Sequence, residues 1–195
     1  MTQYARPTGT TSDGNWTNNH TTVDNTNDPT GTGADGDFVI GDGSTGSEIQ
    51  LDLALGNTIT DPSTGADHKL YFRFKVSDAT DGSGAQSSGS STLTVKLMEG
   101  GSTRVTRTIN TSTTPALGDS FTYNSATSGA TGFNLTAGEA NSISSYDDVF
   151  IRILYEDSEA TDYIFISQVV LEAPDASAGT PIGPISMNTY RQLRN

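Results

Sequence analysis

The segment from residue 146 to residue 171, YDDVFIRILYEDSEATDYIFISQVVL, holds the densest run of apolar side chains in the chain. Apolar residues occupy alternate positions from Val149 to Tyr155, and this period of two predicts a strand with one buried face. A second strand is predicted from residue 163 to residue 171. The acidic link between them, EDSE, is too polar to bury, so the two strands are predicted to form a hairpin with an exposed loop. The rest of the chain must then pack against this pair.

Further strands are predicted wherever short alternating runs are bounded by turn residues. The clearest is KLYFRFKVS, in which Leu70, Phe72 and Phe74 share one face, while Tyr71, Arg73 and Lys75 lie on the other. The predicted runs are residues 37–40, 47–55, 69–77, 92–98, 103–109 and 120–123. With the pair above, this makes about eight strands, which predicts an all-β fold, an antiparallel β-sandwich or jelly roll.

One short helix is predicted after residue 135. Thr136 and Glu139 have the spacing of a capping box, in which each side chain bonds the backbone N–H of the other residue. Ala137, Ala140 and Ile143 are predicted to face the core. The pattern supports only one or two helical turns before the strand that begins near Val149.

Composition excludes several functional classes. A net charge of −13 argues against nucleic acid as a partner, because phosphate binding needs Lys and Arg clustered on one face. The absence of cysteine excludes disulfides, thiolate zinc sites and a cysteine nucleophile. No run approaches the roughly 18 apolar residues of a membrane span, and the first residues lack a signal-peptide pattern. The sequence therefore predicts a protein that is made in the cytoplasm and binds neither nucleic acid nor membrane.

Three parts are predicted along the chain. Residues 1–35 contain almost no core material and form an extended N-terminal segment, which either lies over the domain or reaches another chain. Residues 36–173 form the β-sandwich. Residues 174–195 contain three prolines and form an extended C-terminal arm.

The C-terminal arm carries more apolar surface than a solvated tail needs. It is predicted to dock on its own domain, on a second copy or on another protein, and the alternative is a frayed end. The residues assigned to docking are Ile182, Ile185, Met187, Tyr190, Arg191, Leu193 and Arg194.

Two kinds of ligand contact are considered. Trp16, Tyr71 and Tyr123 could stack on a sugar ring, although a buried anchor is the favoured interpretation of Trp16. Oxygen ligands for calcium could come from Asp35, Asp37, Asp42 and Glu48. Their spacing matches no complete calcium-binding loop, so a solvated acidic loop is favoured and no cofactor is predicted.

No catalytic pattern is found. His20 and His68 are the only histidines, and the nucleophile-elbow, zinc-helix and phosphate-loop motifs are all missing. Asp147 and Asp148 could be imagined as paired acids, but adjacent strand residues point to opposite faces. They are instead predicted to end the loop before the strand. The sequence predicts a structural or binding protein that is not an enzyme.

Several stretches resemble the small jelly-roll-like modules encoded among the structural genes of tailed bacteriophages. The residues that carry the resemblance are Arg6-Pro7, Gly14–Thr17, Asp37–Val39, Leu135–Ile153 and Pro184–Asn188. The resemblance implies a virion structural protein exposed on the particle, either a tail, fibre or baseplate component or a head decoration. It also implies assembly through the terminal arms, as a homo-oligomer such as a trimer and with other virion proteins. The alternative is a carbohydrate-binding module or adhesin that recognises a host surface glycan.

Overall fold

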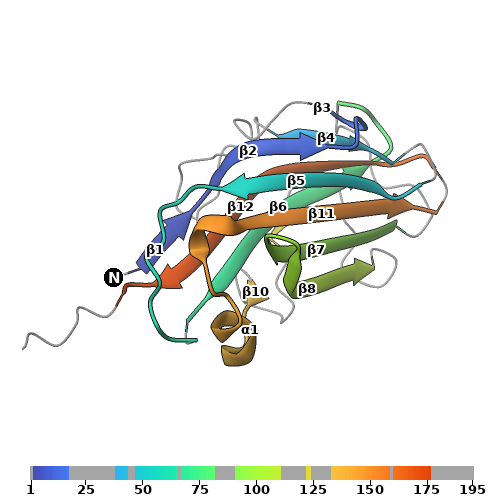
Figure 1. Ribbon diagram of the computed structural model, residues 1–195. Helices are drawn as coiled ribbons and strands as arrows, with labels where there is room; N and C mark the ends of the chain where they lie inside the picture. Colours follow the sequence, from blue (N-terminus) through green and yellow to red (C-terminus); the bar gives the residue numbers. More distant parts are fainter. Residues whose placement is uncertain are drawn as a thin grey trace, which may run out of the picture.

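The computed structural model describes residues 2–17, 38–43, 47–65, 67–81, 91–110, 122–123, 133–158 and 160–176. Two antiparallel sheets pack face to face, as Figure 1 shows, so the predicted all-β sandwich is confirmed. The seven-stranded sheet contains β1 (Thr2–Ala5), β3 (Trp16–Thr17), β4 (Val39–Asp42), β6 (Lys69–Ser77), β9 (Thr122–Tyr123), β10 (Phe133–Asn134) and β12 (Tyr163–Pro174). The five-stranded sheet has the order β2 (Pro7–Ser12), β5 (Ile49–Leu55), β11 (Val149–Asp157), β7 (Ser91–Glu99) and β8 (Ser102–Asn110). About eight strands were expected, and the excess consists of short strands with weak patterns.

The core lies between the two sheets. The inward row of β5, which includes Leu51 and Leu53, and the inward row of β11, which includes Ile151, belong to one buried cluster with Phe72 and Phe74 of β6. Full burial of such a side chain contributes about 1.5–3 kcal/mol. The alternation along β5, β6 and β11 therefore explains both the strands and the face that each one buries.

The predicted hairpin between β11 and β12 is wrong. β11 pairs with β5 and β7 in one sheet, whereas β12 pairs with β4, β6 and β1 in the other. The link crosses the sandwich, and Asp157 closes it by accepting hydrogen bonds from the N–H groups of Thr161 at 2.7 Å and Asp162 at 2.9 Å. Because the apolar rows of both strands face the same core, the sequence pattern cannot distinguish a crossover from a hairpin.

Part of the predicted N-terminal segment belongs to the sheets. β1 pairs with β12 and β2 pairs with β5, so the chain passes from one sheet to the other near Arg6. The carbonyl oxygen of Arg6 accepts a hydrogen bond from the N–H of Gly56 at 2.8 Å. Each of these strands buries only one small residue, Ala5 in β1 and Pro7 in β2, and otherwise depends on backbone pairing, which is why composition does not reveal them. Residues 18–37 and the C-terminal arm from residue 177 lie outside the described residues.

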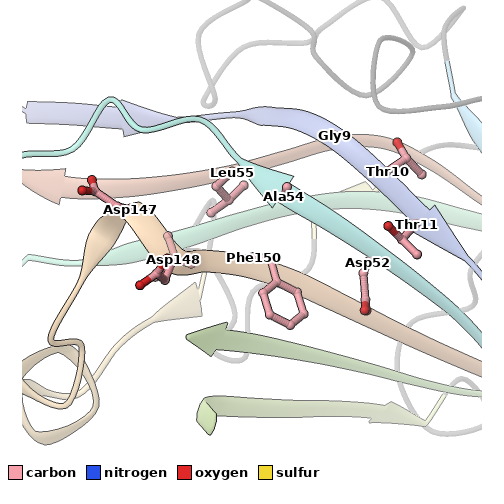
Figure 2. Close-up of a pocket in the computed structure, with 10 residues that line it drawn as sticks. Gly9, Thr10, Thr11, Asp52, Ala54, Leu55, Asp147, Asp148 and Phe150 are labelled. Atoms are coloured by element: carbon pink, nitrogen blue, oxygen red, sulfur yellow. The ribbon is translucent and has the colours of Figure 1, made fainter. Parts of the chain in front are cut away.

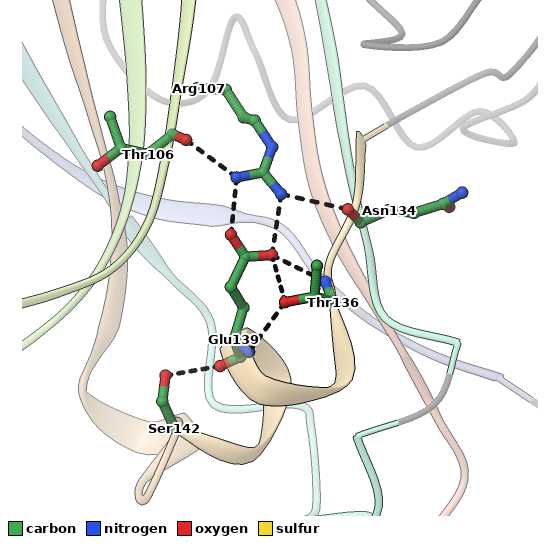
Figure 3. Close-up of polar contacts among 6 residues, drawn as sticks. All are labelled: Thr106, Arg107, Asn134, Thr136, Glu139 and Ser142. Carbon is green, nitrogen blue, oxygen red and sulfur yellow. Dashed lines mark hydrogen bonds and ion pairs between the residues drawn. The ribbon is translucent and has the colours of Figure 1, made fainter.

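The predicted helix is α1 (Ala137–Asn141), and its capping box is confirmed. Figure 3 shows Glu139 also bound by Arg107 of β8, with N···O distances of 2.8 and 2.9 Å. Ala140 and Ile143 are buried as predicted, but Ala137, the first residue of the helix, is exposed. Among the described residues no helix is long and apolar enough to cross a membrane.

Candidate functional site: a groove over Phe150

A groove of about 440 Å³ lies on the outer face of the five-stranded sheet, and we call it the Phe150 groove. It runs between the edge strand β2 and the short 3₁₀ turn Tyr146–Asp148 that leads into β11. Figure 2 shows Asp147 and Asp148 on one side of the Phe150 ring and Asp52 on the other. The lining residues are Gly9, Thr10, Thr11, Asp52, Ala54, Leu55, Asp147, Asp148, Val149 and Phe150.

The groove exists because small residues stand beside a large one across three strands. Phe150 of β11 is opposite Ala54 of β5, and Ala54 is opposite Gly9 of β2. Neither Ala54 nor Gly9 has a side chain long enough to cover the ring, so one flank of Phe150 stays open to the groove.

The next row along the same strands holds an ion pair. Arg152 and Asp52 are directly opposite each other, and the guanidinium donates to both carboxylate oxygens, each at 2.8 Å. The carbon centre of this guanidinium also lies 5.5 Å from the centroid of the Phe150 ring. The hydrogen bond to Asp52 raises the pKa of Arg152. Asp52 and Arg152 therefore neutralise each other, and neither contributes a free charge to the groove.

Asp147 and Asp148 form an acidic rim at the other end of the Phe150 groove. Both side chains are exposed, and within the part of the chain that the structure describes their carboxylates form no hydrogen bond or ion pair. The prediction that both residues end the loop before the strand is confirmed, because the turn ends at Asp148 and β11 begins at Val149. A 3₁₀ turn rotates successive residues by about a third of a turn, so both can line one groove.

Three contacts hold the turn that carries the acidic rim. The buried hydroxyl of Tyr146 lies 2.6 Å from Nε2 of His68. The carbonyl oxygen of Asp148 accepts a hydrogen bond from the N–H of Gly100 at 3.1 Å. Just before the turn, the N–H of Ser144 donates to the carboxylate of Glu99. Burial would raise the pKa of Glu99, but the hydrogen bonds from Ser144 and Arg104 outweigh it, so this pKa is lowered.

A second cavity, of about 340 Å³, lies on the inner side of the same turn. Tyr146, Asp61, Ser63, Thr64 and Asn141 are among the residues that line it. Burial is the largest cause that raises the pKa of Tyr146 to about 12, and the negative charges of Asp61 and Glu99 raise it further. The phenol therefore keeps its proton at neutral pH. The turn forms a wall between two cavities, with an aromatic side chain on one side and two carboxylates on the other.

The structure does not present two of the predicted sugar-stacking side chains to solvent. Trp16 is 8% exposed and belongs to the core, which agrees with the buried-anchor interpretation. Tyr71 is 2% exposed, and its hydroxyl donates to Glu172 at 2.6 Å. Tyr123 is in β9 opposite Arg73, and its side chain lies outside the described residues.

The remaining predicted sites are only partly within the described residues. Asp42 is in β4 and Glu48 precedes β5, whereas Asp35 and Asp37 fall outside. No group of three or more His, Cys, Asp or Glu side chains that could hold a metal ion occurs among the described residues. All seven predicted docking residues of the C-terminal arm, from Ile182 to Arg194, lie outside them.

Sequence patterns single out neither Phe150 nor Asp52. In the sequence, Phe150 is one of several outward residues of an alternating strand. Its exposure depends on the small residues Ala54 and Gly9, which lie beside it on the next two strands of the sheet. A register prediction for β2, β5 and β11 could have found the groove. Local sequence motifs contain no such long-range information.

No protein-family model and no curated protein matches the chain. Among solved structures, it is similar to the Stig cyclase Fisc from Fischerella sp. TAU, in complex with (3Z)-3-(1-methyl-2-pyrrolidinylidene)-3H-indole. The identity is 10% and the TM-score is 0.39. The match covers 71% of this chain and 64% of the cyclase chain, which is less than two thirds of the cyclase.

This comparison runs against the functions expected from the sequence. The Stig cyclase is an enzyme, and it is neither a phage structural protein nor a carbohydrate-binding module. We therefore correct both expected functions, together with the expectation that the chain is not an enzyme, and carry none of them forward. A likeness at a TM-score of 0.39 assigns no activity to the present chain, so its function is argued from the Phe150 groove alone. The resemblance to phage modules, the trimer and the virion location stay predictions.

Proposed function

We propose that this protein binds small organic cations in the Phe150 groove. The observation that supports the proposal most is a single groove that combines one partly open aromatic ring with two carboxylates, for which the described residues provide no hydrogen-bond or ion-pair partner. The faces of aromatic rings attract cations, and quaternary ammonium groups are a common ligand of such sites.

The charges of the groove favour a cation over a neutral or anionic ligand. Asp147 and Asp148 supply the negative charge, because Asp52 is neutralised by Arg152. The net charge of −13 adds a long-range field that attracts cations toward the surface. An anion would face the acidic rim and this field together.

The expected affinity is modest. An exposed ion pair contributes about 0.2–1 kcal/mol and an exposed cation–π contact about 0.5–1 kcal/mol. With an apolar contact to Phe150 of about 1–2 kcal/mol, these terms correspond to a dissociation constant of about 1–50 mM. The volume of about 440 Å³ falls within the range of about 300–1,000 Å³ that is usual for small-molecule sites.

The test compares two probes that share a shape and differ in charge. Choline carries a quaternary ammonium, and 3,3-dimethylbutan-1-ol is its neutral analogue. Titrations followed by NMR should show choline binding about fivefold more tightly, which corresponds to about 1 kcal/mol. The perturbed resonances should include Phe150, Thr11 and the turn that carries Asp147.

Two variants complete the experiment. The double variant Asp147→Asn with Asp148→Asn should abolish the preference for choline, because it removes the charge and keeps the shape. The matched control is Glu156→Gln, which removes an exposed charge from the same strand β11, six residues beyond Phe150. Equal affinity of the two probes for the unaltered protein, or an unchanged preference in the double variant, would refute the proposal.

A further inference from the structure

The buried residue Tyr146 and the exposed residues Asp147 and Asp148 belong to one three-residue turn. The first side chain points into the molecule, and the other two line the Phe150 groove. A displacement of Tyr146 therefore moves both carboxylates, because the three residues are consecutive in one 3₁₀ turn.

His68 is the group that fixes Tyr146. It is 1% exposed, and its Nε2 atom lies 2.6 Å from the phenol oxygen. The two rings also stack, with centroids 6.0 Å apart and planes inclined by 23°. The pKa of about 12 keeps the phenol protonated, so this hydrogen bond persists at neutral pH.

His68 is itself held by the fold. It immediately precedes β6, and its carbonyl oxygen accepts a hydrogen bond from the N–H of Leu135 at 3.0 Å. The preceding residue, Asp67, has a φ of +56°, a conformation that non-glycine residues seldom adopt. The imidazole therefore stands at a position that the seven-stranded sheet and its neighbouring loop determine, and it transmits that position to Tyr146.

We propose that the hydrogen bond between His68 and Tyr146 sets the charge selectivity of the Phe150 groove by positioning Asp147 and Asp148. This inference rests on the proposed function. His68 and Tyr146 are positioning residues, since neither is one of the residues that line the Phe150 groove.

Loss of the hydrogen bond between His68 and Tyr146 should affect the binding of cations and of neutral ligands differently, for a structural reason. Phe150 is anchored by β11, which pairs with β5 on one side and β7 on the other. Its ring keeps its place when the turn shifts. Loss of the hydrogen bond should weaken choline binding while the binding of 3,3-dimethylbutan-1-ol to the ring stays unchanged.

The test uses three variants of the full chain and the same two probes. In Tyr146→Phe only the hydroxyl is lost, and we expect the choline preference to fall from about fivefold to below about twofold, with unchanged affinity for the neutral probe. In His68→Gln the side-chain amide can still form a hydrogen bond with the phenol, whereas the leucine side chain in His68→Leu can form none. His68→Gln should therefore keep more of the preference than His68→Leu, although both side chains are similar in volume.

The outcomes separate this inference from the proposed function. If the unaltered protein prefers choline, the double Asn variant loses the preference and Tyr146→Phe keeps it, only the present inference is refuted. If the double Asn variant keeps the preference, the proposed function fails and this inference fails with it. A general loss of stability would lower the affinity for both probes together, which also refutes positioning. Should Tyr146→Phe not fold, the comparison of His68→Gln with His68→Leu decides by itself.

Discussion

The outer faces of the two sheets follow the same alternation but differ in their exposure to water. On the five-stranded sheet, Phe150 and Arg152 are partly exposed. On the seven-stranded sheet, the corresponding outward residues Tyr71, Arg73 and Phe165 are buried. Alternation therefore predicts the face on which a side chain lies, and it does not predict whether that face meets solvent.

The largest expected difference in the free energy of unfolding is between alanine variants of two phenylalanines, one on each outer face. Phe165 is fully buried, packs edge to face against Phe38 at 5.2 Å and lies under the ammonium of Lys75 at 5.3 Å. Phe165→Ala should lower the free energy of unfolding by about 3–5 kcal/mol. Phe150→Ala, at a partly exposed site, should lower it by about 1 kcal/mol. Urea denaturation of both variants measures the contrast, and equal losses would show that the two faces are equally accessible.

Polar contacts on the two faces should differ less. Tyr71→Phe removes the hydrogen bond from a buried hydroxyl to the carboxylate of Glu172, and we expect a loss of about 1.5–3 kcal/mol. Asp52→Asn weakens the partly exposed pair with Arg152, for which about 0.2–1 kcal/mol is expected. Thermal unfolding of the two variants compares them. A larger loss for Asp52→Asn would reverse the ranking of the two faces.

A further expected effect lies at the edge strand β8 and, unlike the others, depends on pH. The hydrogen bond from Arg107 is the main cause that lowers the pKa of Glu139 from 4.5 to about 2. Because the folded state favours the ionised form, the stabilisation is complete above about pH 4.5 and is lost as the pH falls toward about 2.

Glu139→Gln should therefore be less stable than the unaltered protein at pH 7, by about 1 kcal/mol. The difference should shrink between pH 4.5 and pH 2. Unfolding curves at several pH values test whether this stability difference shrinks or grows on acidification. Glu156→Gln is the control, since Glu156 is exposed and should show no such trend. A difference that grew on acidification would contradict the assigned ion pair.

Much of the fold could be predicted from local patterns. β6 coincides with the predicted run of residues 69–77, and the capping box of Thr136 and Glu139 is present. These features depend on spacing over a few residues, which a sequence displays directly. The partner of each strand depends on the whole topology, so the crossover between β11 and β12 was predicted as a hairpin.

Most of the candidate site could not be predicted from the sequence, for the same reason. The acidic rim was visible as Asp147 and Asp148, but the 3₁₀ turn that brings them to one groove was not. The open flank of Phe150 depends on register with Ala54, and the buried partner of Tyr146 is His68, 78 residues away in the chain. Long-range pairing of this kind leaves no trace in a local pattern.

The position of β12 in the chain also dictates an order of events during folding. It pairs with β1, β4 and β6, and Thr2 stands opposite Pro174, so these contacts join segments far apart in the chain. Such non-local pairing makes folding slow, with times in the range of about milliseconds to seconds. On the ribosome, the inner strands of the seven-stranded sheet must wait for residues 163–174 before their edges are covered, and an exposed strand edge is a site of aggregation. The moment at which this sandwich is most prone to aggregate therefore falls just before β12 emerges.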